Sequence, residues 1–174
     1  CHPRGKKSDC VVGDFVRWQD SGDEGVIEHI EPRRNLLHRQ DEWKIKSFAA
    51  NLDQVLVIVA GEPMFSESQL ARALIAAESA GIAAHVLLNK CDLPQTGAAR
   101  ERLAPYRAMG TPVHETALKA QAEAARALLA PLLAGPTTLV LGPSGMGKST
   151  LINLMVHGAA AQTGEISAAL NAGR

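Results

Sequence analysis

The feature that most constrains the fold is a glycine-rich segment between an apolar run and an amphipathic run. Residues 142–150 read Gly-Pro-Ser-Gly-Met-Gly-Lys-Ser-Thr, with two glycines five positions apart, followed by lysine and serine. The preceding residues 137–141 predict a strand, and residues 151–157 predict a helix. Such a turn directs several backbone N–H groups toward one point at a helix N-terminus, where they bind phosphate oxygens. The segment therefore has the pattern of a phosphate-binding loop, or P-loop.

Three side chains of this loop have distinct predicted roles. Lys148 would hold the β- and γ-phosphates and stabilise charge during phosphoryl transfer, which makes it the candidate catalytic residue. The Ser149 hydroxyl would ligate Mg²⁺, and Thr150 would reach the α-phosphate. The alternative is a glycine turn with a solvated lysine. We assign phosphate binding to the whole loop: Gly142, Pro143, Ser144, Gly145, Met146, Gly147, Lys148, Ser149 and Thr150.

Apolar strands alternate with alanine-rich helical segments after residue 50, which predicts βαβ units and a mainly parallel sheet. Leu52–Ala60 is a predicted buried strand. Ser66–Ala80 is a predicted helix with Ser66 as its N-cap and Gly81 after its end. The same reasoning predicts strands at Val86–Leu88, Pro112-Val113 and Thr137–Leu141, and helices over Ala98–Met109, over Gln121–Leu133 and from about Gly147.

The first 50 residues have a different texture, with short apolar stretches separated by turn residues and with four of the six aromatic residues of the chain. This texture is typical of a small β-barrel. The predicted strands are Val11-Val12, Phe15–Trp18, Gly25–Ile30 and Asn35–Arg39, which are too few to close a barrel. We therefore predict a partial all-β domain over residues 1–48 and an α/β P-loop domain over residues 49–174.

A second motif, Asn89-Lys90-Cys91-Asp92, directly follows a predicted strand, at the sheet edge where α/β proteins bind ligands. The Asp92 carboxylate can accept hydrogen bonds from N1–H and the exocyclic amine of guanine. Asn89 can bond the base edge and tether neighbouring loops, and the stem of Lys90 can lie on the ring. Adenine offers neither donor, so ATP would be rejected. The alternative is an ordinary polar turn after a buried strand.

A weaker element, Thr116-Ala117-Leu118, follows the next short strand and could present a backbone N–H to guanine O6. By itself it is an ordinary turn. We expect His114 and Glu115 beside it to be solvated, and we assign them no role. Cys91 is interpreted as a spacer between the base-reading residues rather than as a reactive group.

Charge and cysteine content exclude several classes of protein. Eighteen basic residues balance eighteen acidic ones, so no overall basic field attracts nucleic acid or membranes. Three cysteines without zinc-like spacing fit a reducing, cytoplasmic compartment. No apolar run approaches the roughly 20 residues that span a bilayer. Nothing resembles a heptad seam, and we expect a monomer.

The order of the two motifs along the chain is unusual and resembles that of a known family. Common small GTPases place the P-loop before the Asn-Lys-x-Asp motif, whereas here residues 89–92 precede residues 142–150, as in a circular permutation. With Val12-Gly13-Asp14, the segment from Phe48 to Val55 and the segment from Gly142 to Leu151, the chain closely resembles the RsgA/YjeQ family of ribosome small-subunit-dependent GTPases. The resemblance covers nearly the whole chain.

This resemblance implies an OB-fold RNA-binding module followed by a circularly permuted GTPase domain. It implies GTP/GDP and Mg²⁺ as ligands, the small (30S) ribosomal subunit and its 16S rRNA as partners, and hydrolysis of GTP to GDP and phosphate that the subunit stimulates during its late maturation. Family members also have earlier OB strands, a switch I threonine run, an Asp-x-x-Gly loop and a C-terminal zinc-binding domain. Because this sequence holds none of these, we expect a fragment that binds nucleotide better than it hydrolyses it.

RNA contact is supported mainly by the resemblance. Basic and aromatic residues are mixed in the first 50 positions, but nine basic residues there face nine acidic ones, which alone favours a solvated mixed-charge surface. The candidate contacts are Arg4, Lys6, Lys7, Arg33, Arg34, His38, Arg39, Trp43, Lys44 and Lys46.

Two other functions remain open. The chain could be a P-loop ATPase or kinase-like enzyme without guanine selectivity, in which residues 89–92 are incidental. It could also be an RNA-binding module whose nucleotide site is structural. Guanine selectivity separates the first alternative from a GTPase, and nucleotide-dependent affinity for the ribosome separates the second.

Overall fold

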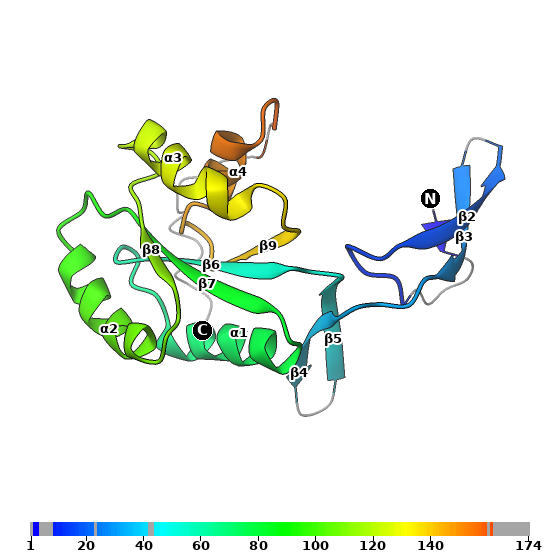
Figure 1. Ribbon diagram of the computed structural model, residues 1–174, viewed down its shortest axis with the longest axis horizontal. Coiled ribbons are helices and arrows are strands. Elements are labelled where there is room, and N and C mark those ends of the chain that lie inside the picture. Colours follow the sequence, from blue (N-terminus) through cyan, green and yellow to red (C-terminus); the bar gives the residue numbers. More distant parts are fainter. Residues whose placement is uncertain (1, 4–8, 23, 42–43, 160, 162–174) are drawn as a thin grey trace, which may run out of the picture.

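Four parallel strands form the centre of the part of the chain that the structure describes (Figure 1). The computed structural model describes residues 2–3, 9–22, 24–41, 44–159 and 161. The strands are β6 (Gln54–Ala60), β7 (Ala83–Asn89), β8 (Val113–Glu115) and β9 (Thr138–Leu141), in the spatial order β8-β7-β6-β9. The predicted α/β fold with a mainly parallel sheet is confirmed.

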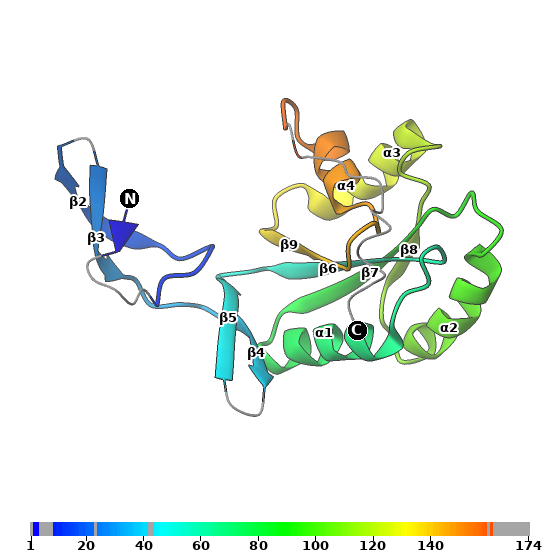
Figure 2. The ribbon, with the colours of Figure 1, turned by 180° about the vertical axis from the view of Figure 1, so that it is seen from behind.

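The helices divide between the two faces of this sheet. α1 (Glu67–Ser79) and α2 (Thr96–Ala108) lie on one face, and α3 (Ala122–Leu133) and α4 (Lys148–Met155) lie on the other (Figures 1 and 2). The chain moves outward from β6 through β7 to β8 and then returns past β6 to β9. Because crossovers are right-handed, this reversal of direction puts α3 on the face opposite α1 and α2. The reversal also opens a crevice between the carboxyl ends of β6 and β9, where α/β proteins bind ligands.

The sequence located the α/β elements to within a few residues. The Ser66 hydroxyl accepts a hydrogen bond from the backbone N–H of Gln69 at 3.4 Å, so the predicted N-cap of α1 is confirmed. α2 begins two positions before the predicted Ala98, and its hydroxyl-bearing first residue Thr96 bonds back to the preceding loop. α3 continues through Pro131. The central strand β6 is buried at every position.

Antiparallel strand pairs precede the sheet. β2 (Val16–Ser21) pairs with β3 (Glu24–Ile30), and β4 (Leu36–Asp41) pairs with β5 (Lys44–Ala50). The other edge of β3 pairs in parallel with β1 (His2–Pro3). These strands are consistent with the predicted partial OB-fold barrel. The strand expected at Val11-Val12 is a single bridge from Val12 to Ala49, and β5 was not predicted, because its sequence does not alternate cleanly between apolar and polar residues.

The β4–β5 hairpin packs against the α/β region, where β4 contacts α1 (Figure 2). Leu37 and Ala49 from this hairpin are almost fully buried and belong to the same apolar core as the central strands. The predicted domain boundary after residue 48 therefore falls inside β5. Among the described residues, no helix has the length and apolarity to cross a membrane.

Candidate functional site

The P-loop follows β9, and at two of its glycines the backbone lies too close to neighbouring atoms to leave room for a side chain. Gly142, Gly145 and Gly147 have φ values of 149°, 78° and 108°. A Cβ atom at Gly142 would lie 2.5 Å from the carbonyl oxygen of Ile58, and one at Gly147 would overlap the amide nitrogen of Asn89. Glycine is therefore required at both positions for the loop to pack this closely on β6 and β7.

The start of α4 presents free backbone donors to the loop. Gly147 is the N-cap, and Leu151 makes the first backbone bond of the helix, to the Gly147 carbonyl at 2.9 Å. The N–H groups of Lys148, Ser149 and Thr150 therefore have no partner within the helix. They lie at the positive end of the helix dipole, so this geometry suits an anion.

Lys148 is folded over the loop. Its ammonium donates to the carbonyl oxygens of Gly142 and Pro143, both at 2.7 Å. Burial lowers the pKa of Lys148, because desolvation disfavours the charged form. A negatively charged ligand in the loop would offset this effect, so the lysine and the free N–H groups together suit an anion.

Asn89 joins the P-loop to two other loops. Its side chain is 4% exposed, its Nδ2 donates to the Met146 carbonyl at 2.8 Å, and its Oδ1 accepts from the Leu118 N–H at 3.0 Å. The amide therefore connects the phosphate loop to residues 116–118. Its predicted contact with the base edge stays a prediction.

The residues after Asn89 form the motif predicted to read guanine. Lys90 has a left-handed backbone with φ of 62°, and its ammonium donates to the carbonyl of Glu62, beyond β6, at 2.7 Å. Asp92 is exposed and makes no hydrogen bond or ion pair with any other described residue. The structure thus anchors the lysine across the crevice and leaves the carboxylate of Asp92 available to a ligand.

The segment Thr116-Ala117-Leu118 is buried beside this motif. The Thr116 N–H donates to the Leu88 carbonyl at 2.8 Å, and its own carbonyl accepts from the Cys91 N–H at 3.0 Å. The Thr116 hydroxyl is buried without a hydrogen-bond partner among the described residues. A buried hydroxyl without a partner is uncommon in proteins.

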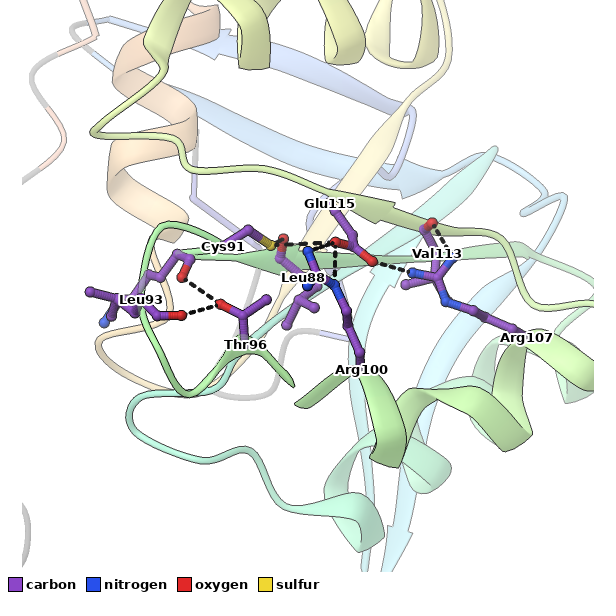
Figure 3. A network of polar contacts seen from close by, with 9 residues as sticks. Leu88, Cys91, Leu93, Thr96, Arg100, Arg107, Val113 and Glu115 are labelled. Carbon is purple, nitrogen blue, oxygen red and sulfur yellow. Dashed lines mark hydrogen bonds and ion pairs between the residues drawn. The ribbon is translucent and has the colours of Figure 1, made fainter. Parts of the chain in front are cut away.

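His114 and Glu115, expected to be solvated, are half-buried and have partners within the chain. The Nε2 atom of His114 lies 3.2 Å from Nδ1 of His85, the two rings are stacked, and burial lowers the pKa of both histidines. Glu115 is held by Arg100 and Arg107 of α2 (Figure 3), and the Arg100 hydrogen bonds lower its pKa. These contacts join β8 to elements distant in sequence. The sequence held one indication of this contact: Arg100 and Arg107 are seven positions apart, so they lie on one face of the helix.

The residues also fit the predicted magnesium role in part. Ser149 is half-buried in the first turn of α4, next to the P-loop donors. The described residues hold no group of three or more His, Cys, Asp or Glu side chains that could bind a metal. Mg²⁺ commonly binds through one or two protein oxygens together with phosphates and water, so a serine hydroxyl beside a phosphate cradle is compatible with it.

Two of the candidate RNA contacts form ion pairs within the chain. Arg33 binds Asp14 through two hydrogen bonds of 2.7 and 2.8 Å, and Arg34 pairs with Asp53 at 2.8 Å. His38 is exposed. The other candidates lie outside the described side chains: Arg4, Lys6, Lys7, Arg39, Trp43, Lys44 and Lys46.

Comparison with known proteins gives a consistent result. A family model described as "RsgA GTPase" matches residues 30–174. "Small ribosomal subunit biogenesis GTPase RsgA" of Variovorax paradoxus is 63% identical over 175 residues, which cover 100% of this chain and 55% of that protein. The protein with the same description from Burkholderia pseudomallei is 58% identical and is covered to 56%.

A solved structure is similar as well. The crystal structure of YjeQ from Thermotoga maritima matches with a TM-score of 0.66 and 30% identity, over 90% of this chain and 56% of that one. The chain therefore spans about half the length of the curated relatives and of the solved structure that it matches.

Proposed function

This chain belongs to the RsgA GTPase family, and we propose that it binds GTP and GDP and supplies the nucleotide site of an enzyme that hydrolyses GTP to GDP and phosphate. The observation that carries the proposal is the buried Asn89 side chain. It fixes the phosphate loop at Met146 and residues 116–118 at Leu118, so phosphate binding and base reading share one rigid unit.

The phosphate half of the proposal rests on the P-loop. The N–H groups at the start of α4 and the Lys148 ammonium would bind the β- and γ-phosphates, and Thr150 would lie nearest the α-phosphate. Ser149 would hold Mg²⁺, which supplies additional positive charge to the phosphoryl oxygens. Lys148 would stabilise the same charge, which makes it the residue of this chain that acts on the reacting group.

The base half of the proposal rests on Asp92. Its exposed carboxylate can accept hydrogen bonds from guanine N1–H and the exocyclic amine, whereas adenine presents an acceptor at N1. Lys90 would cover the ring, with its ammonium held at Glu62. The buried loop Thr116-Ala117-Leu118 would present a backbone N–H to guanine O6.

The partner is proposed from the relatives. Their descriptions name small ribosomal subunit biogenesis, and we propose that the enzyme acts on the small ribosomal subunit late in its maturation, binds its 16S rRNA, works as a monomer in the cytoplasm and is stimulated by the subunit. The exposed Phe15 and Trp18 provide aromatic surface on the β2–β3 unit that suits stacking with RNA bases. Zinc, on this proposal, belongs to a separate C-terminal domain of the family.

The first test measures guanine selectivity. A fluorescent GDP bound to the protein is competed with GDP, ADP and xanthosine diphosphate, in the parent and in Asp92→Asn. We expect selective GDP binding in the parent and a change of preference toward the xanthine nucleotide in the variant, because an amide can donate to the added oxygen. Asp20→Asn, which changes an exposed carboxylate on β2, should leave the preference unchanged.

Other results would favour the alternatives. Equal competition by ADP, with no effect of Asp92→Asn, would indicate an ATPase or kinase-like site. Guanine selectivity combined with equal affinity for small ribosomal subunits in the GDP-bound and GTP-analogue-bound states would indicate an RNA-binding module with a structural nucleotide. Phosphate release measured with and without small ribosomal subunits tests the hydrolysis itself.

A further inference from the structure

The carboxylate of Glu115 lies where β8 meets α2, on the sheet face that α2 covers (Figure 3). Its Oε2 accepts two hydrogen bonds from Arg100, at 2.9 and 2.7 Å, and its Oε1 accepts one from Arg107, at 2.8 Å. Arg107 also donates to the Val113 carbonyl at 3.3 Å. One carboxylate therefore ties the end of β8 to two separate turns of α2.

The end of β8 is in turn bonded to the base-reading motif. Thr116, the next residue after Glu115, accepts from the Cys91 N–H at 3.0 Å and donates to the Leu88 carbonyl at 2.8 Å. Cys91 directly precedes Asp92 in the sequence. A movement of Glu115 would therefore reach Asp92 through two hydrogen-bonded peptide groups.

The first residue of α2 also contacts the loop that contains Asp92. The Thr96 hydroxyl lies 2.6 Å from the Leu93 carbonyl (Figure 3). It also lies 3.3 Å from the carbonyl of Lys90. The segment 90–93 is thus fixed by α2 at Thr96 and by β8 at Thr116. The bond between Glu115 and Arg100 joins these two supports and closes a ring of contacts around Asp92.

We propose that Glu115 is a positioning residue for guanine recognition, acting through Arg100 and Arg107 to hold the Asp92 carboxylate in place against the base. The inference rests on the proposed function. Glu115 itself touches no part of the nucleotide in this arrangement. Its side chain is 29% exposed and those of the arginines 53% and 41%, so these ion pairs contribute little to folding, and their main effect is on loop geometry.

The test compares GDP with inosine diphosphate, which lacks the exocyclic amine of guanine. The ratio of the two dissociation constants measures the hydrogen bond from that amine to Asp92. In Glu115→Gln we expect the preference for GDP to fall about three- to tenfold, which is part of what a hydrogen bond to a charged group supplies. Arg100→Ala should lower it in the same direction. The double variant should show no larger loss than the greater single one, because both changes break the contact between Glu115 and Arg100.

A matched control removes another ion pair of the same helix. Glu67→Gln breaks the 3.6 Å contact between Glu67 and Arg102, which joins α1 to α2 away from the base-reading motif. We expect its preference for GDP to equal that of the parent. Should Glu115→Gln fail to fold, Arg100→Lys carries the same test, because lysine keeps the charge and loses the paired donors.

The outcomes separate this inference from the proposed function. If Glu115→Gln lowers the melting temperature but keeps the parent's GDP-to-inosine-diphosphate ratio, Glu115 is merely structural and the inference is wrong. A parent that does not discriminate GDP from ADP or inosine diphosphate overturns the proposed function, and this inference with it.

Discussion

The two regions of the molecule are held in place by different forces. In the α/β region every residue of β6 is buried, and Leu56 and Leu87 have no exposed surface. In β2 the side chains from Arg17 to Asp20 are all exposed, although alternate residues point to opposite faces of a strand. Burial of apolar surface therefore stabilises the α/β region, whereas the β2–β3 unit gains little from it.

Hydrogen bonds and ion pairs join the α/β region to the segment that carries β2 and β3. Asn51 accepts from the Arg34 N–H at 2.8 Å and donates to the Gly13 carbonyl at 2.9 Å, and Asn35 and Leu52 exchange two hydrogen bonds. Asp53 binds Arg34 and also accepts from the Thr137 N–H at 2.7 Å, directly before the strand that leads into the P-loop. Apolar packing therefore builds the α/β region together with the β4–β5 hairpin, whereas the segment that carries β2 and β3 is positioned by a few hydrogen bonds.

The largest expected effect tests the difference in packing. Leu56→Ala should lower the free energy of unfolding by about 2–5 kcal/mol, because it leaves a cavity in a fully buried strand. Trp18→Ala, at a side chain that is 57% exposed, should cost less than about 0.5 kcal/mol. Urea denaturation measures both. Equal losses would show that the two regions are not stabilised differently.

The next effect concerns the P-loop. Gly147→Ala places a Cβ against the amide of Asn89 at a φ of 108°, so we expect a cost on the order of 1–2 kcal/mol and at least about a tenfold loss of GDP affinity. Titration with fluorescent GDP measures the loss. Gly97→Ala in α2 is the control, since a Cβ there meets nothing within 4 Å and binding should not change. Unchanged affinity in Gly147→Ala would contradict the close packing of these loops.

The third effect is local and concerns the junction between the two regions. Asn51→Ala removes two hydrogen bonds and places alanine at a φ of 56°, which should cost about 1–3 kcal/mol locally. Hydrogen exchange should show lost protection in residues 9–36, with little change in β6 and β7. Asn51→Gly also removes the hydrogen bonds but adopts this φ without strain, so it separates the loss of hydrogen bonds from the backbone strain. Uniform loss of protection across the chain would mean that the junction and the α/β region unfold together.

The smallest effect is a pH dependence confined to the same junction. The hydrogen bonds from Arg33 lower the pKa of Asp14 in the folded state. The unfolded state therefore binds the proton more readily, and the contact stabilises the fold above the ordinary pKa of about 3.9 and is lost as the pH falls below it. Hydrogen exchange around residues 9–14, compared between pH 6 and pH 3, measures the loss. Asp14→Asn should remove most of this dependence, and an unchanged dependence would assign it to another group.

The sequence predicted those elements that depend on contacts between residues close together in the chain. The P-loop, the cap at Ser66 and the parallel strands follow from residue order and hydrophobic period, and the structure has the corresponding elements close to the predicted positions. The sequence did not predict the partners of His114 and Glu115, because His85, Arg100 and Arg107 come from other elements. It missed β5 because that strand owes its place to pairing with β4 and to burial of Ala49 and Ala50 rather than to its own pattern.

The sequence by itself determined the motifs, their order along the chain and the α/β class, since glycine spacing and hydrophobic period act over a few residues. Only the tertiary structure decided how the loops after the parallel strands are joined through Asn89 and Lys90, and how Glu115 ties β8 to Arg100 and Arg107 of α2. These contacts join residues that are 8 to 57 positions apart. They exist because the sheet brings the carboxyl ends of its parallel strands to one edge, and residue order alone does not specify which side chains meet there.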